Sequence, residues 1–148
     1  MNPSHVRTRI LEEHEVLRLH LRKLEEAVDA MLVDDAHLVT VSRLARKLLV
    51  DLTSHTELED AILAPALLEI DAWGPVRVGA LLEHHERQRQ QARELSEVYE
   101  STDSPLSIAH LTCALVRDLQ EDMQHEEQEI LNADLLRDDL VSVAAECG

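Results

Sequence analysis

Apolar residues recur three and four positions apart along most of this chain, in four long stretches. Positions with this spacing lie on one face of an α-helix, so each stretch predicts an amphipathic helix. The first helix is expected to run roughly from Ser4 to Val33, with an apolar stripe of Ile10, Leu17, Leu21, Leu24 and Val28. Further helices are expected at about residues 36–63, 75–100 and 105–131, followed by a short acidic helix at about residues 133–145.

Three polar clusters mark the turns between these helices. The first is Asp34-Asp35, the second spans residues 71–75 and contains a glycine and a proline, and the third spans residues 101–105. Long helices joined by short turns predict an all-α fold, namely an antiparallel up-down-up-down four-helix bundle with a short C-terminal helix. Pro65 is expected to end or kink the second helix, because proline interrupts helical hydrogen bonding. No linker divides the chain, so residues 1–148 are expected to form a single domain.

Composition and charge narrow the possible partners. Leu, Ala and Val supply the predicted core, because aromatic residues make up only 1% of the chain and Phe is absent. The formal net charge of −16 argues against nucleic acid or an anionic membrane as a partner. No apolar run has the length of a membrane span and no signal peptide is seen, so the cytoplasm is the expected location. The oligomeric state is left open.

Two His-x-x-x-Glu motifs carry the candidate chemistry. They are His55–Glu59 and His125–Glu129, which lie 70 residues apart inside two of the predicted helices. A step of four residues is about one helical turn, so the histidine and glutamate of each motif lie on the same face. Imidazole and carboxylate are ligands for metals that prefer nitrogen and oxygen. Each motif could therefore hold one metal ion, or the two together could bridge a pair.

The positions of four histidines predict that they meet at one level of the bundle. In two antiparallel helices joined by a short turn, residues equally far from the turn lie at the same height. The midpoints between His14 and His55, between His55 and His85, and between His85 and His125 each fall on or beside a predicted turn. One imidazole from each helix is therefore expected in a single layer, together with the glutamates of both motifs.

The faces of these helices support an inward orientation for most of the layer. His14 and His55 share their faces with leucine stripes, and on the third helix His85 rather than His84 follows the inward face. The neighbours of His125 are largely polar, so its assignment depends on the repeated motif. A polar layer without a metal is the alternative, but buried carboxylates without a cation are costly. The predicted metal ligands are His14, His55, Glu59, His85, His125 and Glu129.

This ligand set suits iron or manganese better than structural zinc, which takes four ligands and usually thiolates. If both glutamates bridged two ions, about a third of the octahedral positions would stay open for small ligands. Catalytic triads, Gly-rich phosphate loops and paired-cysteine zinc motifs are absent from the sequence. The Glu-x-x-His motif of ferritin-like di-iron proteins is absent too.

Taken together, these residues resemble the hemerythrin-like family of His-His-Glu cation-binding domains. The resemblance covers nearly the whole chain and depends on His14, the stretch from His55 to Pro65, His85, and the His125–Glu129 motif. It implies one cation-binding domain over residues 1–148, with a non-haem iron centre of two Fe ions inside an antiparallel four-helix bundle. It also implies a role linked to dioxygen, nitric oxide, peroxide or iron.

The chain departs from oxygen-carrying hemerythrins at two positions. Arg89 stands where those proteins have a second histidine on the third helix, and Ile130 stands where they have an aspartate after the last motif. The expected function is therefore a di-iron protein that binds or senses dioxygen or nitric oxide. A peroxide-removing enzyme of the catalase or peroxidase type, iron sensing or iron–sulfur repair, and a metal-free interaction module stay open as alternatives. Whether the protein is an enzyme is thus undecided by the sequence.

Overall fold

The computed structural model describes residues 1–101 and 104–139, and every regular element in these ranges is helical. The predicted all-α class is confirmed. No helix within the described ranges is both long and apolar enough to cross a membrane. The elements are α1 (Pro3–Val33), the 3₁₀ turn η1 (Asp35–His37), α2 (Leu38–Leu58), the π-helix η2 (Glu59–Leu63), α3 (Ala64–Ile70), α4 (Gly74–Ser101) and α5 (Pro105–Glu129).

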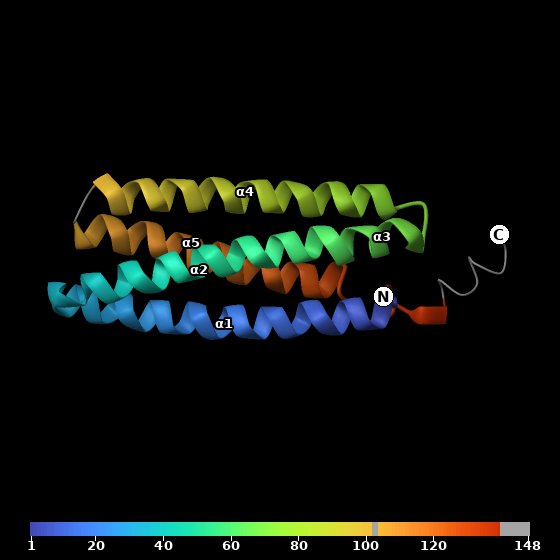
Figure 1. Cartoon of the computed structure of the whole chain (residues 1–148), viewed down its shortest axis with the longest axis horizontal. Helices are drawn as coiled ribbons and strands as arrows, with labels where there is room; N and C mark the ends of the chain where they lie inside the picture. The colour runs from blue at the N-terminus through green and yellow to red at the C-terminus, as the bar shows by residue number, and fades with distance from the viewer. Residues whose placement is uncertain (102–103, 140–148) are drawn as a thin grey trace.

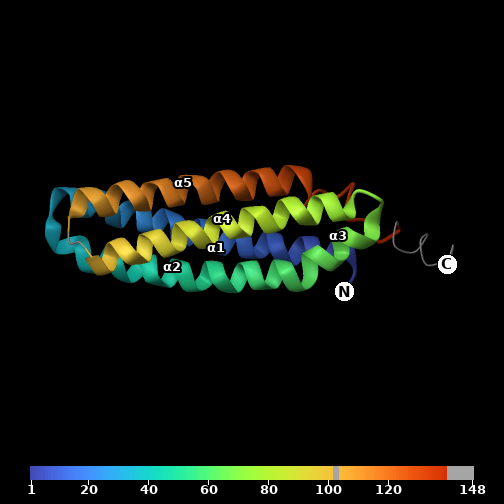
Figure 2. The ribbon, with the colours of Figure 1, turned by 90° about the horizontal axis from the view of Figure 1, so that it is seen from above.

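Four long helices, α1, α2, α4 and α5, lie side by side along the molecule (Figure 1). The connection from α1 to α2 lies at one end of the molecule, and the connection from α3 to α4 lies at the other. A view from above shows the same four helices extended along one axis (Figure 2). Contacts join α1 to α2 and α5, and α4 to α2 and α5, so each long helix packs against two neighbours.

A buried polar layer divides the apolar core into two parts. The larger part lies towards the α1–α2 connection and includes Leu21, Leu24 and Leu48, which are almost inaccessible to solvent. The smaller part lies towards the α3–α4 connection and includes Ile10 and Leu67. On every long helix the buried stripe changes from apolar to polar at the border between these parts. The buried polar residues at this border are His14, His55, Glu59, His85 and Glu126.

The second predicted helix does not end at Pro65. It passes instead through η2, where the N–H of Ala64 donates to the carbonyl of Glu59 five residues earlier, and then continues as α3. Pro65 lies in the first turn of α3, where its missing N–H costs no helical hydrogen bond. A π-helical turn holds one residue more than an α-helical turn and is often found at functional sites. Here it begins at a residue of the buried polar layer.

The predicted C-terminal helix is largely absent from the part of the chain that the structure describes. Residues 133–137 form turns, and residues 140–145 of that prediction lie outside the described ranges. Leu136 packs against the smaller core part. The backbone N–H and the hydroxyl of Ser4 donate to the carboxylate of Asp138, at 3.0 and 2.8 Å. The segment after α5 is therefore attached to the start of α1 without a helix of the predicted length.

Candidate metal centre

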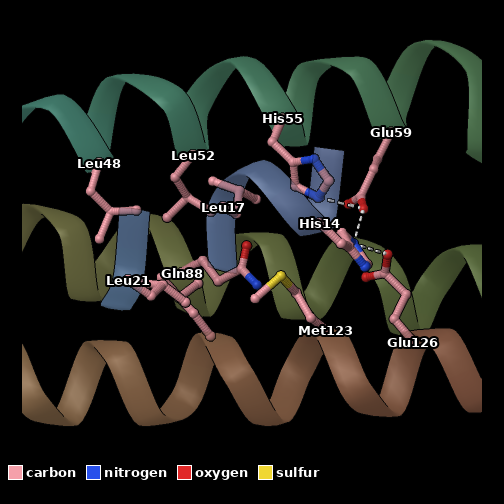
Figure 3. A pocket seen from close by; sticks show the side chains of 11 residues that line it. His14, Leu17, Leu21, Leu48, Leu52, His55, Glu59, Gln88, Met123 and Glu126 are labelled. Atoms are coloured by element: carbon pink, nitrogen blue, oxygen red, sulfur yellow. Dashed lines mark ion pairs between the residues drawn. The ribbon is translucent and has the colours of Figure 1, made fainter. Parts of the chain in front are cut away.

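Three imidazoles and two carboxylates form the buried polar layer, and each long helix contributes to it. His14 comes from α1, His55 from α2, Glu59 from the start of η2, His85 from α4 and Glu126 from α5. None of the five residues is more than 8% exposed. Figure 3 shows His14, His55, Glu59 and Glu126 pointing toward one another from three helices and η2.

The Glu59 carboxylate lies at the centre of the layer. Its Oε1 atom is 2.7 Å from Nε2 of His55 and 3.5 Å from Nε2 of His14. Its Oε2 atom is 2.6 Å from Nε2 of His85. The two oxygens therefore face different imidazoles, which is the arrangement needed for one carboxylate to serve two neighbouring cations.

Donor atoms of His14, His55, Glu59 and Glu126 all lie within 4.8 Å of one another. Oε1 of Glu126 is 3.3 Å from Nε2 of His14. Among the described residues, Nε2 of His14 and the Oε1 atoms of Glu59 and Glu126 are buried atoms without a hydrogen-bond partner. Buried polar atoms without partners are rare and costly. A cation among these atoms would satisfy them, and the donor set fits metals that accept imidazole and carboxylate.

The outer nitrogen of His14 is held by a second carboxylate. Its Nδ1–H donates to Oε2 of Glu127 at 2.9 Å, while Nε2 faces Glu126, the preceding residue of α5. Arg18 in turn donates to the same Glu127 oxygen at 2.5 Å. A carboxylate behind a histidine fixes the ring orientation and the tautomer that leaves the other nitrogen free for a metal.

His85 is held in the same way on the other side of the layer. Its Nδ1 is 2.9 Å from Oδ1 of Asp60, and its Nε2 faces Glu59, the preceding residue. Arg89 approaches the other Asp60 oxygen at 3.6 Å. The layer therefore contains two copies of one device: an acidic pair directs one carboxylate to the centre and the other to the outer nitrogen of a histidine.

Charges within the layer shift its protonation. Burial lowers the pKa of His14, but contacts with Glu126 and Glu59 outweigh burial and raise that pKa to about 10. Burial and the charge of Glu59 raise the pKa of Glu126 well above its usual range. Burial also raises the pKa of Glu59, but hydrogen bonds from His14, His55 and His85 outweigh it and hold that pKa well below its usual range. In the absence of a cation, protons thus balance the buried carboxylate charge.

A small cavity borders the layer on the side of the larger core part. Its volume is about 10 Å³, measured as space for the centre of a water-sized sphere, which is about the space for a single water. Leucines line most of it, with Gln88 and Met123 at one side (Figure 3). The Gln88 amide donates to Asp122 at 3.2 Å. Only a very small molecule could enter this cavity without rearrangement of the core.

The structure brings four of the six predicted ligands together and leaves two outside. His125 and Glu129 lie on the surface with side chains 56% and 63% exposed, and their nearest N and O atoms are 3.2 Å apart. The buried stripe of α5 passes instead through Leu119, Met123 and Glu126. His125 precedes Glu126 by one residue, which turns it by about 100° around the helix, at 3.6 residues per turn. The expectation that the last motif faces the centre is therefore not met.

Glu126 was missed because it is not part of a His-x-x-x-Glu motif. Two signals in the sequence point to it. It continues the apolar stripe of its helix, and the pair Glu126-Glu127 follows Glu59-Asp60 by 67 residues at both positions. Counting the same 67 residues from His55 leads to Asp122, so the α5 copy of the pattern has a carboxylate where the α2 copy has an imidazole.

Long helices around buried imidazoles and carboxylates define a class of helical metal-binding domains. The family model of the hemerythrin HHE cation-binding domain matches residues 5–133, and the chain therefore belongs to the hemerythrin family. The matched range contains all five residues of the buried layer, and the predicted resemblance is confirmed. No curated relative and no solved structure matches the chain closely enough to add to this assignment.

Proposed function

We propose that this protein holds a non-haem iron centre of two ions inside an antiparallel up-down-up-down bundle, and that the centre binds or senses dioxygen or nitric oxide. The observation that carries the proposal is a set of buried, unsatisfied donor atoms beside a cavity of about 10 Å³. Iron would supply a redox-active cation that coordinates a small ligand at positions the protein leaves free. The chain supplies the donors, their orientation and an apolar surrounding.

The ligand assignment follows the two faces of one carboxylate. We assign Oε1 of Glu59, with His14 and His55, to one ion, and Oε2 of Glu59, with His85, to the other. Glu126 supplies a further oxygen near His14. The five residues provide fewer donors than two octahedral ions require, which supports open positions for an added ligand.

The character of the cavity supports a small, uncharged ligand. Its walls are mainly leucine, and it has about the space for one water molecule. A bulky organic substrate does not fit this space, and an anion would lose its hydration beside apolar walls. Dioxygen and nitric oxide meet both conditions.

Metal analysis of the purified protein, followed by optical spectra of the reduced protein under each gas, tests the proposal. We expect two iron ions per chain and a reversible spectral change with nitric oxide or dioxygen. Glu59→Gln and His55→Ala should abolish both. His110→Ala, which changes an exposed histidine on α5, is the matched control and should leave both intact. Iron-free protein after anaerobic reconstitution with ferrous iron would overturn the proposal.

Peroxide removal is the competing function, because peroxide is small enough for the same cavity. Sustained consumption of peroxide by the iron-loaded protein, lost in Glu59→Gln, would identify an enzyme. A spectral change with gas but no sustained consumption would identify a binding or sensing protein.

A further inference from the structure

A second pocket opens on the surface between α4 and α5, and it contains the residues that the buried layer leaves out. Its volume is about 180 Å³, which is much larger than the buried cavity. His84 comes from α4, and His125 and Glu129 come from α5. Glu126 of the buried layer also lines this pocket.

The polar side chains of this pocket form a donor set for a transition-metal cation. The rings of His84 and His125 lie 6.1 Å apart between centroids with 27° between their planes. Nε2 of His125 is 3.2 Å from Oε2 of Glu129, one helical turn further along. Two imidazoles and a carboxylate suit zinc, iron, cobalt or nickel. His125 and Glu129 are exposed, so rotation of their side chains can close the set around an ion.

Charges around the pocket favour a cation. Oδ1 of Asp122 lies 3.8 Å from Nδ1 of His84, which places a carboxylate behind this ring. Arg77 also lines the pocket, but its guanidinium is paired with Asp71 at 2.7 Å. Arg87, which reaches Asp122 at 4.0 Å, is 65% exposed and therefore largely solvated. The positive groups are thus either neutralised or in water.

Glu126 connects the pocket to the buried layer. It lines both the pocket and the small buried cavity, and at 8% exposure it is the most accessible of the five layer residues. Its Oε1 atom has no hydrogen-bond partner and lies 3.3 Å from Nε2 of His14. One carboxylate therefore separates a solvent-facing imidazole pair from the buried donors.

Another pocket, between α2 and α4, also reaches residues that line the buried cavity, namely Leu52 and Gln88. Its outer wall contains Arg89 and Arg93, whose positive charges oppose the approach of a cation. Of these two approaches, the one between α4 and α5 is the better route for a metal ion.

We propose that His84, His125 and Glu129 form an outer binding site for a divalent transition-metal cation, from which the ion passes Glu126 to reach the buried centre. The transfer role rests on the proposed function, because it supplies the buried metal centre, whereas the outer site itself can be measured separately.

Two measurements on the full, metal-free chain test this proposal. Equilibrium dialysis with zinc should find one weakly bound ion per chain beyond the buried ions, and the His84→Ala/His125→Ala double variant should lose it. Anaerobic mixing with cobalt(II), followed by its absorption, should show loading of the buried centre about tenfold more slowly in this variant, with the same final absorption. His110→Ala is the matched control and should change neither result.

The possible outcomes separate the two proposals. If the double variant keeps the weakly bound zinc, the outer site is wrong. If it loses that zinc but loads cobalt at the wild-type rate, the transfer role is wrong and the outer site stands. If the wild-type protein binds only the weak zinc and leaves the buried layer empty, the proposed function fails while the outer site is retained.

Discussion

Glu127 touches the outer nitrogen of His14 and the guanidinium of Arg18, so its charge acts on the buried donors without joining them. Carboxylates in this position orient a metal-binding histidine and strengthen its basicity. We expect Glu127→Gln to weaken iron affinity by about 10–100-fold, measured by competition with a chelator. Glu121→Gln, an exposed change on the same helix, should have no effect. Equal affinities for the two variants would contradict this role.

Tyr99, the only tyrosine of the chain, gives a prediction about pH. Burial raises the pKa of Tyr99 and outweighs the opposing hydrogen bond with Thr112, at 3.1 Å. The folded state then binds the phenolic proton more tightly than the unfolded state does. This contribution to stability is present below pH 10, the ordinary value, and is lost as pH rises through the raised pKa.

The absorbance of tyrosinate measures this pKa directly, because no other tyrosine contributes. We expect the folded protein to titrate above the unfolded one, and denaturant unfolding of Tyr99→Phe to lose less stability above pH 10 than the wild type does. A Tyr99 that titrates at the ordinary value in the folded protein would refute the prediction.

Single residues also show where sequence reasoning about the site succeeds and where it fails. His14 and His55 were placed correctly in the interior because leucines three, four and seven positions away define their faces. His125 has polar neighbours, and a repeated motif spacing fixes which residues share a face but not where that face points. Glu126 takes the inward position because the apolar stripe of α5 leads to it through Met123.

At the scale of elements, the turn into α4 depends on glycine. A Cβ atom added to Gly74 would lie 2.5 Å from the carbonyl oxygen of Leu67, whereas a Cβ added to Gly79 would meet no atom within 4 Å. Both residues belong to α4, so they provide a matched pair. One position needs the absence of a side chain, and the other gains nothing from it.

We therefore expect opposite effects from the same substitution. Gly79→Ala should raise the free energy of unfolding by about 1 kcal/mol, because alanine has the higher helix propensity. Gly74→Ala should lower it by about 1–3 kcal/mol, because backbone atoms must move to admit the methyl group. Chemical denaturation of both variants measures the difference, and a stabilising Gly74→Ala would contradict the packing argument.

The π-helix η2 is the element that the sequence could not reveal. Pro65 correctly signals a disturbance of the second helix, but proline alone does not specify whether the chain stops, bends or takes in an extra residue. The structure takes in an extra residue before the proline. In this segment Glu59 and Asp60 reach the two ring nitrogens of the same histidine, although neighbouring residues of a regular α-helix point about 100° apart.

For the whole molecule, the buried layer makes stability depend on metal. Without a cation, polar groups at the middle of the core are incompletely satisfied, so metal binding and folding are linked. At a free iron concentration a hundred times Kd, binding adds about 2.7 kcal/mol. For a chain of this length that corresponds to a rise in Tm of about 5–10 °C.

Thermal unfolding followed by circular dichroism, with and without a chelator, measures this shift. Glu59→Gln is the control, and its Tm should not respond to the chelator because the central carboxylate is lost. An unchanged wild-type Tm after verified removal of iron would show that the layer is stable without metal.

The helical class and the approximate bounds of the long helices could be predicted because apolar periodicity and the turn clusters agree along the whole chain. The start of the last predicted helix, after residue 132, could not, because short acidic segments are governed by tertiary contacts more than by propensity. In the described part, contacts of Leu136 and Asp138 with the rest of the molecule take that place.

The 67-residue offset between the acidic pairs leaves the two halves of the layer chemically unequal. On the α2 side an imidazole stands four residues before the central glutamate, and on the α5 side Asp122 occupies the corresponding position. Two ions held here would be unlike partners, one richer in nitrogen ligands than the other. Occupancy would then rise in two separate steps, and a half-filled form would persist long enough to be isolated.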